Sequence, residues 1–153
     1  MSISENLKKL GIDVPVAPDP VGSYVAAKQS GKLIFISGQL PIGKDGKPIK
    51  GKLGKDLQTE DGQKAARLCA INILAQVKKA VGGDLDKIKA CVKITGFVNS
   101  TEDFIEQPKV INPASEILST VFGEKGKHAR AAVSVNSLPL GVAVEIDAIF
   151  EIY

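Results

Sequence analysis

The sequence predicts an α+β domain in which one face of a β-sheet packs on two helices. Three observations support this prediction. Apolar residues recur at helical spacing within residues 59–81 and 101–123. Two strand-like stretches precede these helical segments, one lies between them and two follow them. Apolar and polar residues alternate along the last strand. Because the chain has 153 residues, one domain, 1–153, accounts for it, with residues 1–13 as a helical appendage.

The chain is expected to begin with a short helix and a hairpin. Ser2 caps the helix, which Gly11 ends. After a proline-rich lead-in, strands 24–29 and 32–37 pair through a tight turn. The second of these strands is apolar on both faces, which predicts a central strand covered on each side.

A loop and a long helix follow. Residues 38–57 are rich in glycine, proline and lysine and show no core pattern, and a loop of this length is often functional. Thr59 caps the helix, acidic residues in its first turn favour the helix dipole, and the glycine pair 82–83 ends it. An apolar stripe along this helix predicts that one of its faces packs on the sheet.

The second half of the chain predicts a third strand and a second helix. Residues 88–98 alternate as a strand does. The helical segment 101–123 contains prolines, which cannot donate an interior hydrogen bond. One solution starts a helix at Pro113 with Asn112 as its cap.

Strands 129–135 and 142–153 complete the sheet. The last strand has one apolar set and one mixed set in alternation: Val144, Ile146, Ala148, Phe150 and Ile152 against Ala143, Glu145, Asp147, Ile149 and Glu151. Two helices cover only one face of such a sheet. The partly apolar second face and the edge strands therefore predict symmetric self-association.

Composition argues against several classes of protein. The net charge of +3 comes with lysines that glycine and aspartate interrupt, which indicates a solvated loop rather than a nucleic-acid surface. Cys69 and Cys91 lie far apart and the chain has one histidine, so the pattern predicts two buried thiols and no zinc site. Because no apolar run could span a membrane and the N-terminus lacks the apolar core of a signal peptide, a cytoplasmic protein is expected.

Arg130 stands among small apolar residues and needs an explanation. In an extended strand it shares one face with three residues: His128, Ala132 and Ser134. Small neighbours leave room for a ligand, and a guanidinium at the edge of an apolar strand needs an anionic partner such as a carboxylate. The alternative is that Glu145, on the neighbouring strand, pairs with Arg130 as a structural salt bridge.

Three other positions stay open when only the residue pattern is considered. His128 follows glycine and lysine and is more typical of a loop residue than of a catalytic base. Tyr24, near a strand start, is typical of amphipathic packing. Gly38, where the second strand ends, either admits a ligand close to the backbone or marks a bulge.

Several short motifs occur in the order of one known family. They are GSYV at 22–25, ISGQLP at 36–41, A-A-R-x-x-x-x-N at 65–72, VKITGFV at 92–98, Asn112, HARAAV at 128–133 and LPLGVAVEIDAI at 138–149. Over residues 14–153 the chain resembles the RidA/YjgF family, also called endoribonuclease L-PSP. With its N-terminal helix and lengthened loops, it looks like a longer subgroup of that family.

The resemblance implies a chorismate-mutase-like, two-layer domain. Its mixed sheet would carry two main helices on one face, and the chain would assemble as a homotrimer with ligand clefts between subunits. Archetypal family members hydrolyse reactive enamines and imines to 2-oxo acids and ammonia, without a metal or an organic cofactor.

The resemblance also assigns roles to individual residues. Arg130 matches the arginine that holds the substrate carboxylate, and Glu145 matches the glutamate that positions the attacking water. The remaining matches belong to the substrate-binding cleft: Tyr24, Gly38, Asn112 and Ala132. At the last of these, archetypal deaminases often have cysteine, so alanine keeps the backbone groups and removes the thiol.

The expected function is therefore hydrolytic deamination of 2-imino or enamine acids, with a small carboxylate or imine as substrate. The alternative is a non-catalytic protein of the same fold that binds small carboxylate metabolites. A third possibility is an endoribonuclease or translation inhibitor. The sequence argues against it, because it has no dense basic stripe and aromatic residues for base stacking make up only 5% of the chain. The expected partners are a small molecule and other copies of the chain, not a membrane or a nucleic acid.

Overall fold

The computed structural model describes residues 1–20 and 22–153. Its helices are α1 (Ile3–Lys9), α2 (Thr59–Ala80) and α3 (Gln107–Phe122), and its strands are β1 (Ala27–Ser30), β2 (Leu33–Gln39), β3 (Ile88–Asn99), β4 (Ala129–Val135) and β5 (Val144–Ile152). Short 3-10 helices are η1 (Leu85–Lys87), η2 (Gly123–Gly126) and η3 (Pro139–Gly141). The predicted order of strands and main helices is confirmed.

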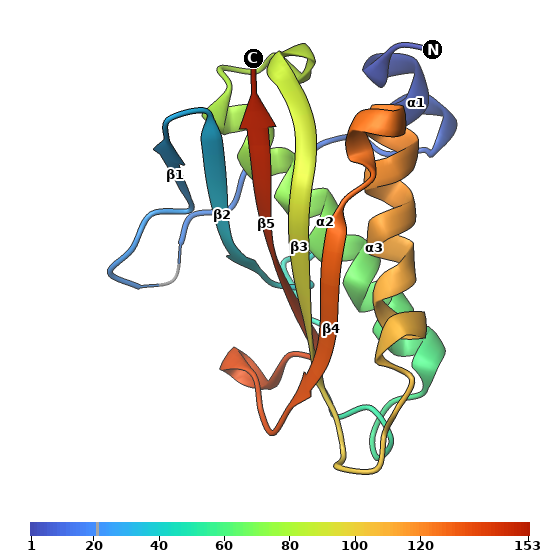
Figure 1. Cartoon of the computed structure of the whole chain (residues 1–153). Coiled ribbons are helices and arrows are strands. Elements are labelled where there is room, and N and C mark those ends of the chain that lie inside the picture. Colours follow the sequence, from blue (N-terminus) through green and yellow to red (C-terminus); the bar gives the residue numbers. More distant parts are fainter. Residues whose placement is uncertain (21) are drawn as a thin grey trace.

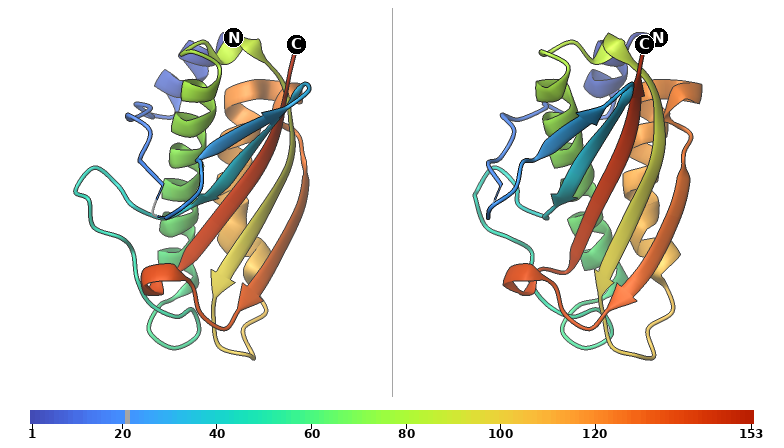
Figure 2. Two further views of the ribbon diagram at one scale, coloured as in Figure 1. Left: turned by 90° about the vertical axis from the view of Figure 1, so that its left-hand side faces the viewer. Right: turned by 60° about the vertical axis from the view of Figure 1, so that its left-hand side comes forward.

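The strands form one mixed sheet in the order β1-β2-β5-β3-β4. Strands β3 and β4 run parallel, whereas the other neighbours run antiparallel. Helices α2 and α3 lie side by side on one face of the sheet, and no helix of the described chain covers the opposite face (Figures 1 and 2). We call the uncovered side the open face. The predicted two-layer α+β architecture is confirmed.

The core lies between the sheet and the two main helices. Alternate residues of β5 point into it, each of them 2% exposed or less: Val144, Ile146, Ala148 and Phe150. The alternation predicted for the last strand is therefore confirmed. Both thiols, Cys69 and Cys91, are also buried as predicted. None of the described helices is long and apolar enough to cross a membrane.

Strand β2 is an interior strand that is covered on one face only. Ile34 and Ile36 are buried beneath the helices, but Phe35 is 42% exposed on the open face. The prediction of a strand covered on each side is therefore wrong for the single chain. Phe35 pairs with Ile149 of β5, and Val133 of β4 is 43% exposed on the same face. The open face thus presents apolar side chains to solvent.

Helix α3 begins at Gln107, so the prediction of a helix start at Pro113 with Asn112 as its cap is wrong. Pro113 lies inside the helix, where it cannot donate to the carbonyl of Lys109 four residues earlier. The side chain of Gln63, on α2, donates to that carbonyl instead, at 3.0 Å. Packing between the helices therefore satisfies the group that proline leaves free, and Asn112 stays within the helix.

The N-terminal segment is bonded to the main body. Ser2 caps α1 as predicted, in a capping box with Glu5. Asn6 donates a hydrogen bond of 3.2 Å to the carbonyl of Val121 on α3. Ile12, just after the helix, is buried in the hydrophobic core. Helix α1 is thus fixed against α3.

The loop 38–57 and the start of α2 each differ from the prediction in one detail. The loop 38–57 does contain a core residue, because Leu53 is fully buried. Its backbone N–H donates to the carbonyl of Asn99, at the end of β3. Helix α2 has Gln58 rather than Thr59 at its N-cap.

Candidate functional site

Arg130 lies on β4 with its side chain toward α3. Its Nη1 donates to Oδ1 of Asn112 at 2.9 Å and to Oγ of Ser115 at 3.2 Å. The two acceptors stand three residues apart on α3 and so share one helix face. Both are uncharged, and among the described residues no carboxylate pairs with the guanidinium. The positive charge of Arg130 is therefore available to an anion.

Glu145 cannot be the partner of Arg130 within one chain. Arg130 pairs across the sheet with Ile94, which pairs with Ala148 of β5, and both of these apolar side chains are buried beneath the helices. Glu145 stands opposite Phe97 and lies an odd number of positions from Ala148, so it points to the open face. The structural salt bridge between Arg130 and Glu145 is therefore excluded, because the sheet separates the two side chains.

Gly38 lies directly beside Glu145. A side chain at Gly38 would collide with the Glu145 carboxylate, so the absence of a Cβ makes room for that group. The pairing of β2 with β5 shifts register between Ile36 and Gln39, which places Gly38 in an irregularity of the bulge type. The irregularity agrees with the bulge interpretation of Gly38, and the group that approaches its backbone within the chain is the carboxylate of Glu145.

The environment of Glu145 changes its basicity. Partial burial raises the pKa of the Glu145 carboxyl above its ordinary value, and the nearby Asp147 raises it further. A carboxylate with a raised pKa is a better proton acceptor. The chain thus has a candidate base on the open face and a candidate anion-binding group, Arg130, on the helix-facing side of β4.

Tyr24 lies at a third place. With Gly38 it lines a cavity of about 570 Å³ between the N-terminal segment, β2 and α2, a size typical of small-molecule sites. Tyr24 is 49% exposed, so about half of its surface is packed against the protein and the other half faces solvent. Arg130 and Glu145 do not line this cavity.

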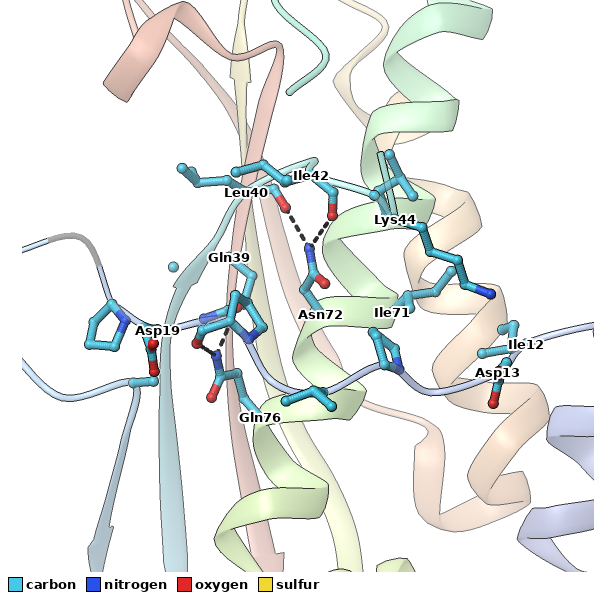
Figure 3. Close-up of a pocket in the computed structure, with 18 of the residues that line it drawn as sticks. Ile12, Asp13, Asp19, Gln39, Leu40, Ile42, Lys44, Ile71, Asn72 and Gln76 are labelled. Carbon is cyan, nitrogen blue, oxygen red and sulfur yellow. Dashed lines mark hydrogen bonds between the residues drawn. The ribbon is translucent and has the colours of Figure 1, made fainter. Parts of the chain in front are cut away.

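Two amide side chains of α2 hold the walls of the cavity (Figure 3). Asn72 donates to the carbonyls of Leu40 and Ile42 at 2.9 and 3.0 Å. Gln76 donates to the carbonyl of Pro18 at 2.7 Å. These bonds tie the segment after β2 and the N-terminal segment to the same helix, so they fix the shape of the cavity.

Ala132 shares the helix-facing side of β4 with Arg130. It stands opposite Gly96 of β3 and packs against the core. The side chain of Ile111, on α3, occupies the space over Gly96, where a Cβ would collide with it. Ala132 therefore lies under α3 in the same strand as the guanidinium, and its contact with a substrate stays a prediction.

His128 lies in the short loop between η2 and β4, as predicted, but its ring is partly buried and hydrogen-bonded. Its Nε2 lies 2.9 Å from Oγ of Ser115 and its Nδ1 lies 2.6 Å from the carbonyl oxygen of Gly126. The sequence analysis did not identify Ser115. Its spacing from Asn112 is a helical signal that points to one shared face, but only once Pro113 is accepted inside the helix.

The predicted site residues therefore gather in separate places. Asn112, Arg130 and Ala132 lie at the α3 side of β4, and Glu145 lies on the open face. Tyr24 lies at the cavity, and Gly38 both adjoins Glu145 and lines that cavity. No three metal-ligating side chains of the described chain lie close enough to hold an ion.

Comparisons with known proteins agree with this fold. A family model described as "YjgF/chorismate_mutase-like, putative endoribonuclease" matches residues 4–151. Protein TCP17 of Trypanosoma cruzi is 46% identical over 151 residues, which cover 98% of this chain and 94% of that protein. The 2-iminobutanoate/2-iminopropanoate deaminase of Mus musculus is 33% identical over 138 residues, or 90% and 87% of the two chains.

A solved structure has the same fold as this chain. Protein Atu1372 from Agrobacterium tumefaciens is 49% identical and superposes with a TM-score of 0.91, covering 99% of this chain and 94% of that chain. The family model spans nearly the whole sequence, and most of the motifs that carried the resemblance overlap the strands of the sheet or the helices α2 and α3. The chain therefore belongs to the YjgF/chorismate-mutase-like family, within which the RidA resemblance placed it.

Proposed function

We propose that this protein hydrolyses 2-imino acids, and the enamines that interconvert with them, to 2-oxo acids and ammonia. The observation that supports this most is the Arg130 guanidinium, which Asn112 holds in place and no carboxylate of the described chain neutralises. Such a group suits a small carboxylate. The similarity to the mouse 2-iminobutanoate/2-iminopropanoate deaminase supports the choice of reaction.

The complete site forms between copies of the chain in this proposal. One chain presents Arg130 and Glu145 on opposite faces of its sheet, so neither can serve the other. The exposed side chains of Phe35 and Val133 on the open face favour association, because contact with another copy removes them from water. A copy whose β4 edge approaches the open face of its neighbour brings the two groups together. A homotrimer closes this contact into a ring.

Arg130 binds the carboxylate of the substrate. Asn112 and Ser115 accept hydrogen bonds from Nη1, and no described residue accepts one from Nε or Nη2. These two donors lie along one edge of the planar guanidinium and match the two oxygens of a carboxylate. Binding at this edge fixes the imine carbon and lowers the entropic cost of bringing water to it.

Glu145 of the neighbouring copy activates the water. Its carboxylate accepts a hydrogen bond from the water and takes a proton while the new C–O bond forms at the imine carbon. Glu145 returns this proton to the substrate nitrogen, the new hydroxyl gives up the second proton of the water by the same route as the C–N bond breaks, and ammonia leaves the 2-oxo acid. One water is consumed for each ammonia released. The raised pKa of Glu145 favours the proton transfer from water.

The experiment uses imino acids that an amino-acid oxidase produces in the cuvette. The wild-type protein should accelerate ammonia release, and the Arg130→Ala and Glu145→Gln variants should not. Lys64→Ala, an exposed change on α2, is the matched control and should keep the wild-type rate. Circular dichroism establishes that all variants fold. A wild-type rate equal to the uncatalysed rate would refute the proposal, and binding of 2-oxobutanoate that depends on Arg130 would then favour the non-catalytic alternative.

A further inference from the structure

Four groups around Arg130 form one continuous hydrogen-bonded chain. Arg130 Nη1 lies 3.2 Å from Ser115 Oγ, which lies 2.9 Å from His128 Nε2, and His128 Nδ1 lies 2.6 Å from the carbonyl oxygen of Gly126. The groups come from different elements: Ser115 from α3, Gly126 from η2, and Arg130 from β4. The chain of bonds therefore links the helix, the connection that follows it and the edge strand.

When the His128 ring is neutral, the chemistry of the two ends decides the direction of every bond. A guanidinium only donates and a carbonyl only accepts. Nδ1 of His128 must therefore carry a proton toward Gly126, and Nε2 of the neutral ring is then an acceptor. Ser115 donates its hydroxyl proton to Nε2, and its lone pairs face the N–H of Arg130. No other arrangement of protons in a neutral ring satisfies all three contacts.

The carbonyl at the end of this chain is rigidly placed. A Cβ at Gly126 would collide with the backbone of Leu118 and Ser119 on α3, so only glycine brings the connection this close to the helix. The close packing fixes the Gly126 carbonyl, and that carbonyl fixes the tautomer of His128.

We propose that Ser115 and His128 are positioning residues for the Arg130 guanidinium. Together with Asn112 they hold Nη1 against α3, so the edge formed by Nε and Nη2 is presented to the carboxylate of a ligand. The imidazole acts as a neutral ring of one fixed tautomer and does not touch the substrate. This inference rests on the proposed function only in its choice of ligand, because the hydrogen-bonded chain exists without it.

The single histidine of the sequence makes the first test direct. In a ¹⁵N NMR spectrum at about pH 8.5, where an ordinary imidazole is neutral, one pair of ring nitrogens should appear. Nδ1 should be the protonated nitrogen, which is the reverse of the preference of a free imidazole side chain in water. A protonated Nε2 would overturn the inference whether or not the protein is an enzyme.

The second test measures ligand binding and turnover in variants. Ser115→Ala should raise KM for the imino acid, and Kd for 2-oxobutanoate, about tenfold, with a smaller change in kcat, because a hydrogen bond to a charged group is lost. Ser115→Thr, which keeps the hydroxyl, should restore both values. His128→Ala should resemble Ser115→Ala, and the double variant should be no worse than Ser115→Ala alone, because both residues act through one bond.

The outcomes separate the two proposals. Wild-type protein that binds 2-oxobutanoate but releases no ammonia contradicts the proposed function and leaves the positioning role intact. Active wild-type protein with an unchanged KM and Kd in the Ser115→Ala variant contradicts the positioning role alone. Additive losses in the double variant also contradict it, because independent effects would mean that His128 does not act through Ser115.

Discussion

Mixing two inactive variants should restore activity if the site forms between copies. Arg130→Ala removes the group proposed to bind the carboxylate and leaves Glu145 in place, whereas Glu145→Gln removes the proposed base and leaves Arg130 in place. The two residues lie on opposite faces of the sheet in one chain. Each proposed site therefore draws its arginine from one copy and its glutamate from another.

The size of the recovery follows from this arrangement. When equal amounts of the two variants associate at random, half of the arginine positions and half of the glutamate positions are intact. About a quarter of all sites then contain both groups, so about a quarter of the wild-type rate should return. This fraction does not depend on how many copies close the ring, and the mass of the assembly measured by light scattering decides that number.

The assay compares ammonia release before and after the variants are unfolded together and refolded. Native mass spectrometry of differently tagged chains shows whether mixed assemblies have formed. Each variant refolded alone is the control and should stay inactive. Mixed assemblies that remain inactive, while the wild-type protein survives the same treatment, would refute a site shared between copies.

Four other changes test separate steps of the reasoning. Gly38→Ala should lower kcat with little loss of fold, since the new methyl group displaces the Glu145 carboxylate. The value of kcat/KM should rise with pH as Glu145 ionises, with an inflection above the ordinary glutamate pKa, and an inflection at or below that ordinary value would contradict the role of Glu145 as base. Gln63→Ala should lower the free energy of unfolding, measured in urea, by about 1 kcal/mol. In a Pro113→Ala background the same change should cost much less, because alanine restores the missing N–H donor to the Lys109 carbonyl. Phe35→Asp should shift the light-scattering mass toward the monomer, and an unchanged mass would mean that the open face is not the contact.

Local patterns predicted the faces of individual strands well. Alternation placed Arg130 and Ala132 on one face of β4, and the structure puts both on the helix-facing side. This succeeds because side chains of an extended chain alternate whatever the rest of the protein does. The same reasoning placed Glu145 on the mixed face of the last strand, which is the open face.

Local rules failed where another element supplied the missing interaction. The rule that proline starts a helix moved the expected start of α3 to Pro113, but Gln63 satisfies the carbonyl that proline leaves free. His128 does lie in a loop, but the pattern did not reveal its partner Ser115, which lies 13 positions earlier on a helix whose predicted start was wrong. Neither partner is a sequence neighbour of the residue that it bonds.

The sequence by itself determined the order of the elements, the family, and the side chains that share a face within each strand. It could not determine whether Arg130 and Glu145 meet, because that depends on the register of three strands and on which face the helices cover. Register is decided by the packing of distant apolar residues, not by the period of one strand. The tertiary structure placed the two groups on opposite faces and gave Arg130 the partners Asn112 and Ser115. For that physical reason, a pair that looked like a salt bridge became two halves of a proposed site between copies.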